Sequence, residues 1–469
     1  MHFENCYDAR RRQTPINGVA GIHFGGVTML TTLPQRLLLM LALLSSASGA
    51  GLAAEPNIAR ETQGAFAAIL AHPQVKHGLG FLKSDDANTL AEQKALVVIP
   101  APPFKEQARA ENYRSRLAAL GLKDVRIDAE GNAIGVRPGA GGGPKLVVAA
   151  HLDTVFPEGT DITIKEKDGK LYAPGIGDDT RGLADLLSVI RAFNSAGIRT
   201  VGDLYFVGNV GEEGLGDLRG VKAIFRDNKD IDGFISIDGA EPDRITYLAT
   251  GSHRYRITFK GPGGHSFSAF GLPSAIHAMG RAIARIGDVK TPRQPKTTFT
   301  VGTVRGGTSV NAIAGDAEME IDMRSNDNAA LVRLEAEIMQ AIKYAVADEN
   351  ARWGSDKITV ESKLVGDRPA GIQSIDSPIV QAAFLATRAI GLKPKATDAS
   401  STDSNLPISL GIPAVTLGRG GKGGANHSID EWWDPTDAHL GPQRQFLAIL
   451  ALVGIEGVAP PMLQKKTPR

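Results

Sequence analysis

The chain is nearly free of cysteine: Cys6 is the only one among 469 residues. Because Cys6 precedes a signal-like segment, we expect the mature protein to lack both disulfides and thiolate metal ligands. Aromatic residues make up only 6% of the sequence, which disfavours a platform for stacking nucleic-acid bases. The formal net charge of +1 gives no electrostatic reason to expect binding to nucleic acid or to an anionic membrane surface.

Several catalytic motifs are also missing. The sequence has no His-Glu-x-x-His pattern, which would place two metal-binding histidines on one helix, and no Gly-x-Ser-x-Gly elbow of a serine hydrolase. The glycine-rich stretch 418–424 lacks the spacing of a phosphate-binding loop and has no serine or threonine after Lys422. These absences argue against helix-borne zinc peptidases, serine hydrolases and nucleotide-binding P-loop proteins.

The N-terminal part of the chain resembles a secretory signal. Arg36 is followed by the apolar run 37–44 and by the small residues 45–50. The apolar run is too short to span a bilayer comfortably. We therefore interpret residues 1–54 as an upstream extension plus a signal peptide, and expect an exported, periplasmic or secreted protein that is free of the membrane after cleavage. A membrane anchor is the alternative.

The length of the chain predicts two domains. Alternating strands and helices over residues 55–250 indicate a doubly wound α/β sheet. The pattern changes near Gly251, where the order strand-helix-strand-strand-helix-strand over 251–365 indicates a ferredoxin-like α+β domain. Residues 366–460 return to the first pattern. We therefore expect a mixed-sheet catalytic domain in two parts, 55–250 and 366–460, interrupted by an inserted domain.

Groups that can bind metals follow the predicted strands or lie in glycine-rich turns. They are His151 and Asp153, Asp178 in the turn 174–182, Glu212 and Glu213, Asp238, and His427. In open α/β sheets, ligands bind at the carboxyl ends of the strands, so these side chains are expected to lie at one edge. Imidazoles and carboxylates without cysteine suit zinc, cobalt or manganese.

A site for two cations needs a carboxylate that bridges them and a separate base that activates water. The adjacent residues Glu212 and Glu213 can supply a base and a ligand. Each element also has a simpler interpretation on its own. His151 can be a structural histidine, the pair Asp178 and Asp179 can cap a helix, and Asp238 can end a strand.

Together these residues resemble the M20 family of dinuclear zinc peptidases and amidohydrolases over nearly all of the expected mature chain. The resemblance implies a zinc-dependent exopeptidase fold and a cis peptide bond between Asp178 and Asp179. It also assigns roles: His151 and Asp238 bind one cation, Glu213 and His427 bind the other, Asp178 bridges them, Glu212 is the catalytic base, and Asp153 orients His151.

In the inserted domain, residues 261–266 resemble the family's glycine-rich histidine motif. The resemblance implies that this domain is a dimerisation lid and that His265 reaches across a homodimer to polarise the scissile carbonyl. It also implies that Asn311 and Arg324 bind substrate, and an arginine fork suits a terminal carboxylate. The simpler interpretations are a turn histidine, a turn asparagine and a surface ion pair.

We therefore expect an exopeptidase that hydrolyses short peptides with two divalent cations, zinc in the first place and cobalt or manganese as alternatives. An N-acyl amino acid amidohydrolase with the same site is the second possibility. The third is a non-catalytic binding protein on this fold, which would be expected to lose ligands or the base, whereas all of them are present.

Overall fold

The computed structural model describes residues 55–466, so the predicted extension and signal peptide over 1–54 lie outside the described residues. Within 55–466, no helix is both long enough and apolar enough to cross a membrane. The first described elements are four helices: α1 (Arg60–Ala71), α2 (Pro73–Ser84), α3 (Asp86–Val97) and α4 (Gln107–Ala119).

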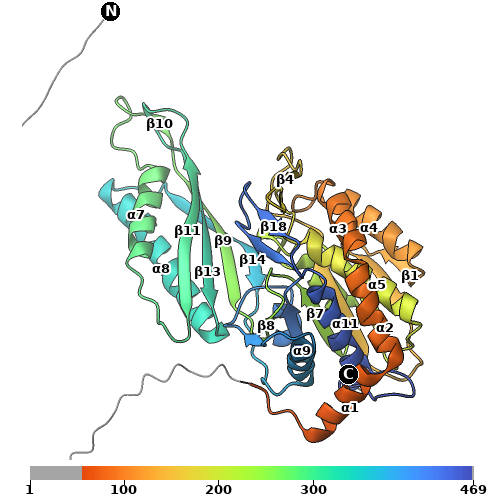
Figure 1. Ribbon diagram of the computed structural model, residues 1–469. Coiled ribbons are helices and arrows are strands. Elements are labelled where there is room, and N and C mark those ends of the chain that lie inside the picture. Colours follow the sequence, from red (N-terminus) through yellow and green to blue (C-terminus); the bar gives the residue numbers. More distant parts are fainter. Residues whose placement is uncertain (1–54, 467–469) are drawn as a thin grey trace, which may run out of the picture. The chain divides into compact units, whose positions relative to one another are not determined.

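An eight-stranded sheet forms the larger part of the fold (Figure 1). In spatial order its strands are β1 (Lys123–Ile127), β2 (Ala133–Arg137), β6 (Asp203–Asn209), β3 (Lys145–His151), β7 (Gly233–Ile237), β16 (Ala414–Leu417), β8 (Arg244–Thr246) and β15 (Lys395–Ala396). The central strands β6, β3, β7 and β16 are parallel to one another. The pairs β1–β2, β2–β6 and β8–β16 are antiparallel, so the sheet is mixed, as the sequence predicts.

Both faces of this sheet are covered, which explains why its central strands are almost continuously apolar. Along β3, Leu146 and Val148 belong to one buried cluster, whereas Val147 and Ala149 belong to another. The first cluster includes residues of α5 (Thr180–Ala196), α9 (Pro378–Ala389) and α11 (Leu440–Val453), and the second includes residues of α6 (Arg219–Asp227) and α10 (Asn405–Ser409). Because successive side chains of a strand point to opposite faces of the sheet, β3 contributes apolar side chains to the helical layers on both sides.

The inserted region forms a separate antiparallel sheet with the order β11-β13-β9-β14. Its elements are β9 (Gly251–Lys260), α7 (Ala275–Gly287), β11 (Thr297–Gly306), β13 (Asp316–Ser325), α8 (Asn328–Arg352) and β14 (Thr359–Arg368). Numbered along the chain, the strand order is 4-1-3-2, that of a ferredoxin-like fold. Helices α7 and α8 lie on one face of this sheet (Figure 1). Apolar residues of the sheet pack against them in a core of their own. Strand β14 runs to Arg368, past the expected boundary at 365, because its pairing with β9 continues to Ser252.

Two small sheets were not predicted from the sequence. Strands β10 (Gly264–His265) and β12 (Ala312–Ile313) pair in the inserted domain. Strands β4 (Lys165–Lys167), β5 (Lys170–Tyr172), β17 (Lys422–Gly424) and β18 (Trp432–Asp434) form a second small sheet, which joins segments far apart in the sequence. The predicted site residue His427 lies in the loop between β17 and β18.

Candidate metal and active site

His151 is the last residue of β3 and is buried, with 1% of its surface exposed. Its Nδ1 lies 2.9 Å from the carbonyl oxygen of Asp153, and its Nε2 lies 3.1 Å from Oδ1 of Asp178. The Asp153 carboxylate is 3.6 Å from His151 Nδ1 and accepts the backbone N–H groups of Glu212 and Glu213 at 3.1 and 2.8 Å. Asp153 thus contacts both the imidazole and the Glu212–Glu213 loop, a typical arrangement for a residue that orients ligands.

Asp178 and Asp179 have different roles, although they are adjacent. Asp179 is the N-cap of α5 and accepts the N–H of Gly182, as the simpler interpretation of this pair requires. The Asp178 carboxylate instead points toward His151, and the peptide bond between the two aspartates is cis. The turn is held by the buried side chain of Glu431, which accepts backbone N–H groups of Gly175, Gly177 and Asp178.

Glu212 and Glu213 follow β6 and are both buried. The chain turns into this pair at Gly211, whose φ of +72° favours glycine and whose Cβ position lies 2.6 Å from Arg219 Cγ. Burial raises the pKa of Glu212 well above its usual range, an effect that Arg368 opposes and Glu213 reinforces. Arg368 donates from Nη1 to Glu212 Oε1 at 3.2 Å and from Nη2 to the Glu212 carbonyl oxygen.

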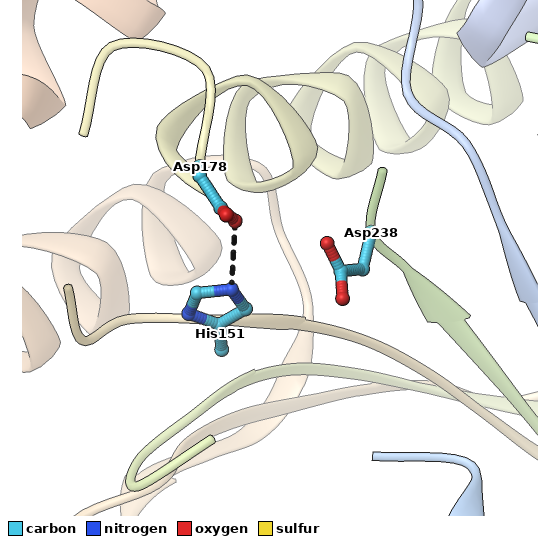
Figure 2. Close-up of side chains that lie close together, drawn as sticks. All are labelled: His151, Asp178 and Asp238. Atoms are coloured by element: carbon cyan, nitrogen blue, oxygen red, sulfur yellow. Dashed lines mark hydrogen bonds and ion pairs between the residues drawn. The ribbon is translucent and has the colours of Figure 1, made fainter. Parts of the chain in front are cut away.

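The five predicted metal ligands converge in two triads that share Asp178. His151, Asp178 and Asp238 can offer one ligand atom each within 4.8 Å of one another, and so can Asp178, Glu213 and His427. Figure 2 shows the first triad, with Asp178 above the imidazole and joined to it by a dashed line, and with the Asp238 carboxylate beside them. His427 Nε2 lies 3.0 Å from Glu213 Oε1 and 3.6 Å from Asp178 Oδ2. This donor set fits two cations bridged by one carboxylate, and Glu212 forms a further group with His151 and Glu213.

A pocket of about 440 Å³ opens onto the triads. Besides the acidic residues and histidines, its wall includes four arginines: Arg244, Arg254, Arg324 and Arg368. Arg324, predicted as a substrate ligand, therefore lies in this wall. The two other residues predicted in the inserted domain are elsewhere. His265 and Asn311 are exposed neighbours at the β10–β12 pair, and neither is among the described residues that line this pocket.

Sequence reasoning missed the buried arginines at this site. Arg419 is 1% exposed, and its Nη1 lies 3.2 Å from Asp178, 2.9 Å from Asp179 and 3.5 Å from Asp238. It lies in the glycine-rich stretch 418–424, whose spacing differs from that of a phosphate-binding loop. The signal that could have found Arg419 is its position two residues after the buried strand β16, the same kind of position that identified Asp153.

Comparison with known proteins agrees with this geometry. Residues 147–452 match the description "Peptidase family M20/M25/M40". The chain is 26% identical over 290 residues to a succinyl-diaminopimelate desuccinylase of Paraburkholderia xenovorans, covering 57% of this chain and 76% of that one.

Solved structures show the same fold. A tripeptidase from Staphylococcus aureus superposes with a TM-score of 0.64 at 24% identity, covering 78% of this chain and 97% of the other. A dinuclear metal-binding peptidase of the M20 family from Bacillus subtilis gives a TM-score of 0.58 at 17% identity, covering 79% of this chain and 99% of the other.

Proposed function

The chain belongs to peptidase family M20/M25/M40, and from that premise we propose that it is an exopeptidase that hydrolyses short peptides with two bound zinc ions. Members of this family are metal-dependent hydrolases. The observation that carries the proposal is the pair of triads that share Asp178, with Glu212 beside them and outside both. A separate carboxylate next to a two-cation site is what metal-assisted hydrolysis requires of a base.

In this proposal His151 and Asp238 would hold one ion, Glu213 and His427 would hold the other, and Asp178 would contribute to both sites. When bound, two divalent cations polarise a carbonyl group and make water more acidic. Glu212 accepts the proton of the attacking water and then delivers it to the leaving amine. His265 of the partner subunit stabilises the developing oxyanion, and Arg324 binds a substrate carboxylate.

The decisive experiment replaces Glu212 with glutamine, which preserves size but cannot accept the proton. We expect Glu212→Gln to abolish turnover of di- and tripeptides, while the metal content stays near two ions per chain, as a two-metal site requires. Glu158→Gln, an exposed residue outside the pocket, is the control. Retained activity of Glu212→Gln would overturn the proposed mechanism.

Deacylation of N-acyl amino acids by the same site is the second candidate, favoured by the similarity to a desuccinylase. Peptide and N-acyl amide hydrolysis break the same kind of C–N bond, so the triads do not discriminate between them. Parallel assays of dipeptides, tripeptides and N-acetyl amino acids with one metal-loaded preparation distinguish the two activities. A higher kcat/KM for the N-acetyl compounds would favour the deacylase.

We further propose that the inserted domain forms a homodimer and that the protein is exported. Phe267, Phe270 and Val310 are strongly exposed apolar side chains near the β10–β12 pair, where a second copy would cover them. Light scattering of the wild type and of Phe267→Ser/Phe270→Ser tests the dimer, and a monomeric wild type would exclude it. Fractionation of cells that express the full chain tests export.

A further inference from the structure

Charge in the pocket is not balanced once cations are bound. Its wall carries four arginines and four carboxylates, the latter being Asp178, Glu212, Glu213 and Asp238. Two divalent cations would then leave four surplus positive charges. Behind this wall lie Asp322, which pairs with Arg254 and Arg324, and the buried groups Arg419, Asp153 and Asp179, so the surplus describes the side chains that line the pocket and not the whole site. A concave site with such a surplus attracts anions and disfavours cationic ligands.

Two of the four arginines use their terminal guanidinium nitrogens in hydrogen bonds within the protein. Arg368 bonds to Glu212, and Arg254 bonds to Asp322 and to the carbonyl oxygen of Gly214. The other two are only partly used. Arg324 donates from Nε to Asp322 at 2.7 Å, and Arg244 donates from Nε to Thr246 Oγ1 at 3.2 Å. Within 55–466, the terminal Nη atoms of Arg244 and Arg324 donate no hydrogen bond to the protein.

The two arginines whose Nη ends lack hydrogen bonds come from different domains and line the same pocket. Arg324 lies in β13 of the inserted domain, whereas Arg244 begins β8 of the large sheet, and its Nη1 is 3.7 Å from the Cβ position of the pocket residue Gly239. An arginine fork matches a carboxylate with two parallel hydrogen bonds. A pocket of about 440 Å³ is within the range that accommodates a small organic ligand.

We propose that Arg244 is a specificity-determining residue that binds a second substrate carboxylate, so that the preferred substrates are amides with two carboxylates. This inference rests on the proposed function and narrows its substrate class. Arg324 binds one carboxylate and Arg244 binds the other. If the enzyme is a peptidase, such a substrate is a dipeptide with a free terminal carboxylate and an acidic side chain. If it is a deacylase, the substrate is an acidic N-acyl amino acid.

The test compares acidic substrates with neutral isosteres: Ala-Glu with Ala-Gln, Glu-Ala with Gln-Ala, and N-acetyl-Glu with N-acetyl-Gln. For at least one pair, we expect the wild type to favour the acidic member in kcat/KM by about tenfold or more, the effect of one charge-assisted hydrogen bond. Arg244→Gln should bring that ratio close to one, and Arg244→Lys should restore part of it. Arg226→Gln, on the exposed side of α6, should keep the wild-type ratio.

Equal rates within every pair, or an unchanged ratio in Arg244→Gln, would overturn the inference while leaving metal-dependent hydrolysis standing. Failure to hydrolyse any substrate would count against the proposed function instead. In that case, calorimetric titration of the metal-loaded protein with glutarate and butanoate still tests Arg244. Tighter binding of glutarate that is lost in Arg244→Gln supports the inference, and equal affinities refute it.

Discussion

The guanidinium group of Arg368 holds the carboxylate of Glu212 at 3.2 Å, and both side chains are buried. Arg368 is the last residue of β14, so this hydrogen bond joins the sheet of the inserted domain to the loop of the large domain that contains Glu212 and Glu213. Arg254 of β9 contacts the same loop at the Gly214 carbonyl oxygen. The orientation of the proposed base therefore depends on the junction between the two domains.

Removal of the Arg368 side chain should impair the chemical step more than substrate binding. For Arg368→Ala we expect kcat to fall by about 10- to 100-fold, because a hydrogen bond to a charged group contributes about 1.5–3 kcal/mol, while KM changes less. Arg368→Lys should recover part of the loss. Steady-state kinetics with metal analysis of each variant make the measurement, and the exposed Arg305→Ala is the control. A rise in KM at unchanged kcat would instead assign Arg368 to substrate binding.

His427 is the most exposed of the predicted ligands, with 55% of its side chain accessible. His427→Ala removes one member of the triad with Asp178 and Glu213, while the triad of His151, Asp178 and Asp238 stays intact. We therefore expect the purified variant to retain about one ion per chain instead of two. Elemental analysis after dialysis measures the stoichiometry, with His77→Ala on α2 as the control. Unchanged metal content would remove His427 from the ligand set.

Two glycines of α2 provide a test of packing. A Cβ on Gly78 would lie 2.6 Å from Phe446 Cζ, whereas a Cβ on Gly80 has no heavy atom within 4 Å. Gly78→Ala should destabilise the fold by about 1–3 kcal/mol through overpacking. Gly80→Ala should stabilise it by up to about 1 kcal/mol, since alanine favours the helix. Urea unfolding measures both, and equal shifts for the two variants would contradict the packing seen here.

Glu349 should give the inserted domain a pH-dependent stability. Burial opposes its ionisation, but hydrogen bonds from Ser274, Arg281 and Trp353 outweigh this effect and lower its pKa below the usual value. The stabilisation is complete above the unfolded-state pKa of about 4.3 and is lost as the pH falls through the lower folded-state pKa. We expect Glu349→Gln to lower Tm more at pH 7 than at pH 3.

The matched control for Glu349 is Glu337→Gln, an exposed residue of the same helix α8. It should show no such difference between the two pH values. A Tm difference for Glu349→Gln that is the same at both pH values would indicate that the hydrogen bonds do not depend on the charge of the carboxylate. Differential scanning calorimetry of the three proteins at both pH values makes the measurement.

The candidate metal ligands could be predicted from the sequence because each lies beside a local pattern, such as the apolar run that ends at His151 or the glycine-rich turn around Asp178. The ferredoxin-like order of strands and helices could be predicted for the same reason, since these elements are long enough to show their periods. Strands β8 and β15 have only three and two residues, too few to show any period. Arg368 is 156 residues from Glu212, and no local spacing links the two.

Strand β16 lies between β7 and β8, and it comes from the part of the chain that follows the inserted domain. The backbone N–H of Asp238 donates to the carbonyl oxygen of Leu417 on that strand, and His427 comes later still. A ribosome must therefore complete most of the polypeptide before both triads can assemble. A polypeptide that ended near residue 366, where the second part of the large domain begins, would lack His427. It would also leave β7 as an apolar edge of the sheet, which favours aggregation. Such fragments would be inactive and suitable substrates for cellular quality control.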